Sequence, residues 1–120
     1  MLHHELLENE GLLMLRPQGA IQAGDFDAVT RSVDPYIERK GILRGVMIEA
    51  PAFPGWDSFA AFVSHLRFIR DHQRHIGKVA AVSDSAFLSF APQVAKHFVK
   101  AEIRHFDAHD RESALAWLRE

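Results

Sequence analysis

Apolar and polar residues are distributed along this chain in blocks that predict strands and helices in alternation. Two short segments near the N-terminus, residues 3–8 and 11–17, flank a polar junction containing Gly11, an arrangement that suits a β-hairpin. Three further strand-like segments follow, at residues 42–49, 78–83 and 101–106. The chain is therefore expected to open with antiparallel strands.

Segments with apolar residues at helical spacing lie between these strands. They cover residues 25–40, 57 to about 75, 85 to about 99, and a last stretch capped by Asp107 or Asp110. Pro35 falls inside the first of them. Because proline lacks a backbone donor and clashes with the preceding turn, this helix is expected to kink there or to restart with Asp34 as its cap.

The second predicted helix has the clearest amphipathic pattern. Asp57 is its predicted N-cap, and its apolar residues share one face: Phe59, Phe62, Val63, Leu66, Ile69 and Ile76. The last helix is expected to face the core with four apolar residues: Ala114, Leu115, Trp117 and Leu118. The order of elements predicts one α/β domain over residues 1–120, with an N-terminal antiparallel hairpin followed by parallel strands that alternate with about four helices.

Composition narrows the classes of function. The 120 residues carry a formal net charge of −2, which gives no general attraction to nucleic acid. The sequence has no cysteine, so disulfides and zinc–thiolate sites are excluded. The first ten residues lack the pattern of a signal peptide, and no apolar run approaches the roughly 20 residues of a membrane span, so a cytoplasmic protein is expected.

Five segments together suggest a family. They are RPQGAIQAGDFDAV at residues 16–29, PGWDSFAAF at 54–62, KVAAVSD at 78–84, EIRHF at 102–106 and ESALAWL at 112–118. With the predicted order of elements, the chain resembles the SpoIIAA-like proteins of the STAS superfamily, whose fold is also related to the CRAL-TRIO lipid-exchange domains.

The resemblance implies a non-enzymatic binding domain, of a family suspected of associating with membranes or apolar ligands. It also implies a regulatory ancestry, because anti-sigma-factor antagonists carry a phosphorylatable serine at the start of the helix after the central strand. Ser58 takes that position here, although the glycines and the second serine of the family's turn are absent. The alternative function is thus a regulatory protein–protein interaction module that uses Ser58 and the adjoining helix.

Aromatic residues follow two of the predicted parallel strands. If these strands are neighbours, the rings converge at one edge of the sheet and line an apolar cleft for a lipid-like molecule, formed by Phe53, Trp56, Phe59, Phe87 and Phe90. The alternative is that the rings complete the core beneath the loops. The same residues can also pair two copies of the chain, so a homodimer is a further interpretation.

Basic residues recur along the second predicted helix at Arg67, Arg70 and Arg74, offset by Asp71 alone. Beside exposed aromatic rings, such a face suits contact with anionic lipid head groups at a membrane surface. The alternative is an ordinary solvated helix face.

No catalytic or metal-binding signature is present. His72 and His75 can approach one metal ion from a helix, but further ligands at motif spacing are missing, so neither a metal site nor another cofactor is predicted. Ser58 and His65 lie two helical turns apart, about 10 Å along the axis, which is too far for activation of the hydroxyl. The sequence therefore predicts a binding protein and not an enzyme.

Overall fold

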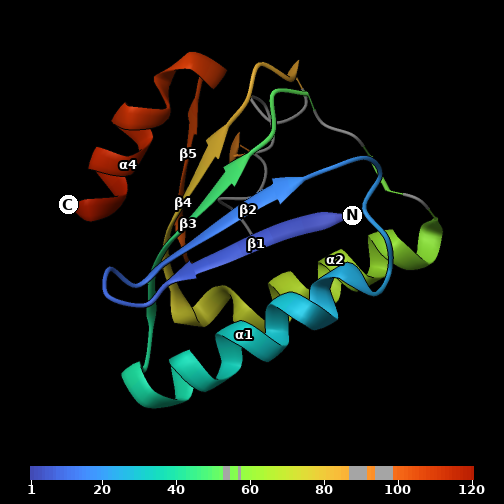
Figure 1. The fold of residues 1–120 in the computed structure, drawn as a ribbon, viewed down its shortest axis with the longest axis horizontal. Helices are drawn as coiled ribbons and strands as arrows, with labels where there is room; N and C mark the ends of the chain where they lie inside the picture. The colour runs from blue at the N-terminus through green and yellow to red at the C-terminus, as the bar shows by residue number, and fades with distance from the viewer. Residues whose placement is uncertain (53–54, 57, 87–91, 94–98) are drawn as a thin grey trace.

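A mixed five-stranded sheet forms the centre of the computed structural model, which describes residues 1–52, 55–56, 58–86, 92–93 and 99–120 (Figure 1). The strands lie in the order β1-β2-β3-β4-β5. Their bounds are Leu2–Leu7, Leu12–Pro17, Leu43–Glu49, Ile76–Val82 and Glu102–Phe106. β1 is antiparallel to β2, and every later neighbour is parallel, which confirms the predicted mixed sheet.

The hairpin between β1 and β2 closes over Gly11. The backbone N–H groups of Glu10 and Gly11 donate to the carbonyl of Leu7 at 3.1 and 2.8 Å. Gly11 has a φ of 70°, and a Cβ at this position would lie 2.9 Å from the Tyr36 hydroxyl. A glycine is therefore required here both by the backbone conformation and by the packing of the neighbouring helix.

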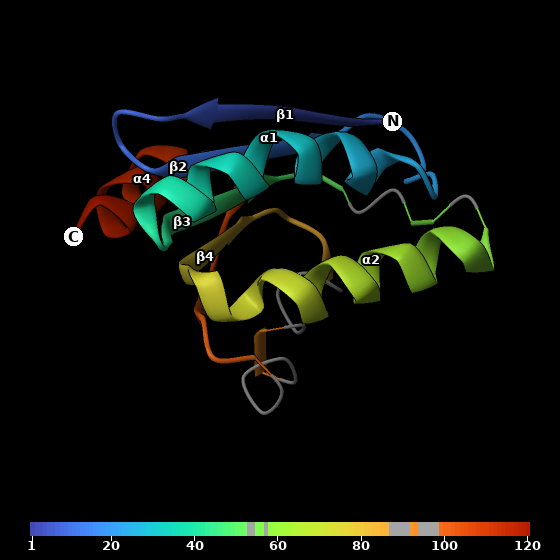
Figure 2. The same cartoon turned by 90° about the horizontal axis from the view of Figure 1, so that it is seen from below.

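Helices cover both faces of the sheet. α1 (Asp25–Lys40) and α2 (Phe59–His72) lie on one face, where they run side by side in the same direction, and α4 (Arg111–Arg119) lies on the other (Figures 1 and 2). The strands alternate between the two cores. In β2, for example, Leu13 and Leu15 join the α1 core, whereas Leu12 and Met14 join the α4 core.

The ends of the predicted helices need some correction. The described residues contain three α-helices instead of about four, and the segment predicted at 85–99 lies mostly outside them. α2 ends at His72 and is followed by a 3₁₀ turn over Gln73–His75, so Ile76 belongs to β4. A second 3₁₀ turn, Ala108–Asp110, precedes α4. Asp110 stands at the N-cap of α4 without a side-chain capping bond.

Two alternatives were predicted at Pro35, a kink or a restart of the helix at Asp34, and the restart does not occur because α1 continues through Pro35. Pro35 is exposed, and its ring adds no apolar surface to the sheet-facing side of the helix, where Val29, Val33 and Tyr36 are buried. Asp34 does not cap a new helix. Its carboxylate instead reaches a histidine of α2, as described below.

The buried side of α2 differs from the side that the apolar pattern predicts. Phe59 and Leu66 are 78% and 50% exposed, whereas Ala61 and His72 are buried. Ala61, His65, Phe68 and His72 follow one another at spacings of four, three and four residues and form a single line along the helix. α2 packs on α1 through this line, where rings from the two helices stack, and part of its apolar stripe remains in solvent.

Candidate functional site

The predicted aromatic cleft can be followed at only two of its five residues, because Phe53, Phe87 and Phe90 lie outside the described residues. The Trp56 ring packs edge-on against Phe62, with ring centroids 4.8 Å apart. The Phe59 ring is exposed at the first turn of α2. Convergence of all five rings in one cleft therefore stays a prediction.

A row of four rings in contact joins α1 to α2. Phe26 of α1 stacks on His65 with centroids 4.7 Å apart and lies 5.1 Å from Phe68, and Phe68 stacks on His72 at 4.2 Å. Both flanking members of the row are histidines. The row therefore contains two titratable rings among its aromatic contacts.

His65 is held in its neutral form. Burial lowers the pKa of its imidazole from 6.5 to about 4, because a charged ring would lose its hydration there. The indole Nε1 of Trp56 donates to the Nδ1 atom of His65 at 3.1 Å, so this nitrogen carries no hydrogen. The bond also fixes the loop residue Trp56 to α2.

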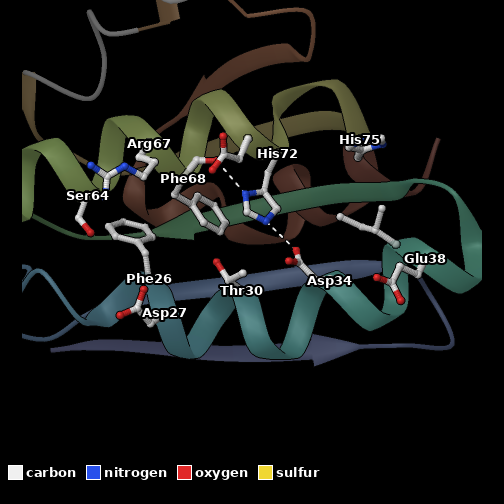
Figure 3. Close-up of a pocket in the computed structure, with 12 residues that line it drawn as sticks. Phe26, Asp27, Thr30, Asp34, Glu38, Ser64, Arg67, Phe68, His72 and His75 are labelled. Atoms are coloured by element: carbon white, nitrogen blue, oxygen red, sulfur yellow. Dashed lines mark hydrogen bonds and ion pairs between the residues drawn. The ribbon is translucent and has the colours of Figure 1, made fainter.

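His72 has a different hydrogen-bonding environment from His65. The residue is only 6% exposed, and its Nδ1 atom lies 2.8 Å from the carbonyl oxygen of Phe68. Its Nε2 atom lies 2.8 Å from the Asp34 carboxylate, across the gap between the helices (Figure 3). Both ring nitrogens thus face oxygen acceptors.

A groove of about 420 Å³ runs between α1 and α2 above these rings (Figure 3). Phe26, Phe68 and His72 contribute to its lining, and so do four carboxylates, those of Asp27, Asp34, Glu38 and Asp71. Sequence reasoning did not find this groove. Polar residues from each helix line the groove, but the sequence alone does not show which of them lie opposite one another, because that depends on how the two helices pack.

We define the outer face of α2 as Phe59, Leu66, Arg67, Arg70 and Arg74, the last lying in the 3₁₀ turn that continues the helix. All five are exposed. Arg70 forms an ion pair with Asp71 at 3.0 Å, with both side chains largely in solvent. The structure therefore places the three predicted arginines beside two exposed apolar side chains.

A second groove, of about 560 Å³, lies along the C-terminal half of α2. Its apolar lining comes from Leu66, Ile69 and Val99, and Arg70 and Arg74 also line it. Among the described residues, no helix has both the length and the hydropathy that a membrane-spanning segment requires.

Ser58 is the N-cap of α2. Its Oγ accepts a hydrogen bond from the backbone N–H of Ala61 at 3.1 Å, and the residue is exposed. The predicted cap, Asp57, lies outside the described residues. An exposed serine therefore stands at the first turn of the same helix that carries the arginines.

Two arginines surround Glu49 where β3 ends. Arg16 of β2 and Arg111 at the start of α4 lie 3.0 and 3.1 Å from its carboxylate oxygens. Burial opposes the charge of Glu49, but the hydrogen bonds and positive charges of Arg16 and Arg111 outweigh burial, so the pKa of this carboxyl lies below its usual value. The network joins the ends of β2 and β3 to the start of α4.

One group of potential metal ligands occurs among the described residues, formed by Asp107, His109 and Asp110. Their ligand atoms lie within 4.8 Å of one another at the surface before α4. Exposed groups of this kind are common without a metal, and we assign no function to it. The two histidines considered from the sequence, His72 and His75, do not belong to this group.

Comparison with known proteins identifies the family. The chain matches the SpoIIAA-like family model over residues 12–119. An uncharacterized protein of the DUF3478 family from Shewanella loihica PV-4, whose crystal structure has a SpoIIAA-like fold, superposes with a TM-score of 0.73 at 21% identity. The alignment covers 98% of this chain and 92% of that one. No curated protein gives a significant match. The extent of the family match shows that this chain belongs to the SpoIIAA-like family.

Proposed function

We propose that this protein is a non-enzymatic binding domain that attaches to anionic, lipid-like molecules at a membrane surface through the outer face of α2. The observation that carries the proposal is the shared lining of the second groove, where Leu66 and Ile69 lie with Arg70 and Arg74. This combination suits an amphipathic anion, because its hydrocarbon tail can pack on apolar side chains while its head group binds a cation.

The exposure of the helix supports attachment to a surface. Phe59 is 78% exposed and Leu66 50%, so both can enter the apolar edge of a lipid layer without unfolding of the core. Arg67, Arg70 and Arg74 lie beside them, and each cation near an anionic membrane contributes roughly 1 kcal/mol. The kinship with CRAL-TRIO lipid-exchange domains that the sequence suggests is a further reason to name a lipid.

Vesicle co-sedimentation tests the proposal. We expect the protein to bind vesicles of phosphatidylcholine with phosphatidylserine more tightly than vesicles of phosphatidylcholine alone, and to lose binding as salt increases. The double substitution Arg70→Gln/Arg74→Gln should weaken binding about 30-fold, because two cations together contribute roughly 2 kcal/mol.

The matched control is Arg31→Gln/Lys40→Gln, which removes two exposed cations from α1 and leaves α2 intact. Binding by this variant should change much less than binding by the α2 variant. Phe59→Ser tests the apolar part and should weaken binding even in high salt. Equal loss from both charge variants, or no binding to either kind of vesicle, would contradict the proposal.

A regulatory protein interaction is the second candidate, and the exposed N-cap serine favours it. Ser58 stands at the position where the family resemblance places a phosphorylated serine, at the start of the helix that carries the proposed docking surface. Ser58→Asp retains an N-cap acceptor and adds a negative charge. If a protein partner from the native cell co-purifies with the wild type and is lost with Ser58→Asp, while vesicle binding is absent, this second function replaces the first.

A further inference from the structure

We propose that His72 and Asp34 form an ionic clasp that holds α2 on α1 while the His72 imidazole is doubly protonated, and that loses its hold when the ring gives up a proton. The clasp does not depend on the proposed function. Only its consequence for the outer face of α2 does.

The positions of the two acceptors determine the protonation of the ring. Nδ1 of His72 lies 2.8 Å from the Phe68 carbonyl oxygen, which can only accept a hydrogen bond. Nε2 lies 2.8 Å from Oδ1 of Asp34, whose side chain is half exposed and which as a carboxylate can only accept a hydrogen bond. Both bonds form together only when each ring nitrogen carries a hydrogen, that is, when the ring is an imidazolium.

The surroundings of the clasp favour a positive charge at His72. The charged or titratable side chains that line the same groove are Asp27, Asp34 and Glu38 of α1 and Arg67, Asp71 and His75 of α2. Four of these six are carboxylates. The Phe68 ring stacked on His72 covers one side of the imidazolium without taking away either acceptor.

α2 has few other polar anchors to α1. Between these two helices the clasp is the hydrogen-bonded pair of side chains, and Ser64 adds a bond from its Oγ to the Ala23 carbonyl just before α1. Only Ala61 and His72 of α2 are buried. Loss of the clasp should therefore loosen the C-terminal half of α2, near His72, before the core of the domain unfolds.

Protonation of His72 and docking of α2 on α1 favour each other in the proposed clasp. The clasp stabilises the docked helix while His72 is protonated, and this stabilisation disappears as the pH rises and the ring deprotonates. If the outer face of α2 binds lipid as proposed above, the orientation of that surface becomes pH-dependent for the same reason.

Nitrogen-15 NMR of the histidine side chains tests the clasp directly. At neutral pH we expect both ring nitrogens of His72 to show protonated chemical shifts, whereas Nδ1 of His65 should show an unprotonated one. In Asp34→Asn, His72 should lose its second proton at neutral pH and hydrogen exchange at the end of α2 should accelerate at least several-fold. The control Asp27→Asn removes a carboxylate from the same groove that makes no bond to His72 and should leave both readouts close to wild type.

The outcome that would overturn the proposal is a neutral His72 in the wild-type protein at neutral pH. Equal effects of Asp34→Asn and Asp27→Asn would also overturn it, because the groove's general charge, and not the clasp, would then control the ring. Asp34 is half exposed, so its substitution should not prevent folding. Vesicle binding is measured separately, and its failure would contradict the proposed function while leaving the clasp intact.

Discussion

Acidification should weaken the fold through His65, and the substitution His65→Gln should remove this effect. The pKa of His65 falls from 6.5 to about 4 on burial, which corresponds to at most about 3 kcal/mol of stability that depends on a neutral ring. The unfolded chain binds a proton near its ordinary pKa, whereas the folded chain does not until the pH is much lower. Stability is therefore complete above about pH 6.5 and is lost progressively down to about pH 4.

Urea unfolding at several pH values, followed by circular dichroism, measures the effect. At neutral pH His65→Gln should be less stable than the wild type, because the stacking of the ring on Phe26 is lost. As the pH falls from 7 to 4, the difference should shrink by up to about 3 kcal/mol, since only the wild type must keep a buried imidazole neutral.

The control is His3→Gln, which changes an exposed histidine of β1. Its difference from the wild type should stay small and nearly constant with pH. Carboxylates that titrate over the same range are present in every variant and cancel in the comparison. A difference between wild type and His65→Gln that does not change between pH 7 and pH 4 would refute the inferred burial of a neutral histidine.

Three further substitutions test other parts of the structure. Gly45→Ala should lower stability by about 1–3 kcal/mol in urea unfolding, because its Cβ would lie 2.8 Å from a methyl group of Leu118; an unchanged midpoint would contradict this packing. Ser58→Ala should cost about 1 kcal/mol through loss of the N-cap, whereas Ser58→Asp should retain most of the stability. Glu49→Gln should reduce the melting temperature at neutral pH, and the gap from the wild type should close as the pH falls through the lowered pKa of Glu49; a gap that is independent of pH would argue against its two ion pairs.

The sheet could be predicted from the sequence because its signals are local. Strands β2, β3 and β4 combine short apolar runs with nearby turns, β5 alternates apolar and polar residues, and Gly11 marks the hairpin. The inward face of α4 was also correct, since Ala114, Leu115, Trp117 and Leu118 are all buried. In these elements one apolar face meets one core, so periodicity and burial agree.

The buried face of α2 could not be predicted in the same way. Periodicity selects the side of a helix with the most apolar residues, which here includes Phe59 and Leu66, yet the helix packs through a line with two histidines. A buried histidine needs a partner for each nitrogen. The Asp34 carboxylate that serves His72 is 38 positions away in the sequence, and no local pattern connects the two residues.

With the proposed clasp, His65 and His72 are expected to give α2 opposite responses to a fall and a rise in pH. His65 accepts a bond from Trp56 and must stay neutral, so its contribution declines as the pH falls below about 6.5. In the clasp proposed above, His72 faces two acceptors and binds Asp34 as a cation, so we expect its contribution to decline as the pH rises. Native-state hydrogen exchange of the α2 amides should therefore show greatest protection at an intermediate pH. Asp34→Asn should remove the decline on the alkaline side only, and His65→Gln the decline on the acidic side only. Protection that changes in one direction throughout would mean that one of the two assigned protonation states is wrong.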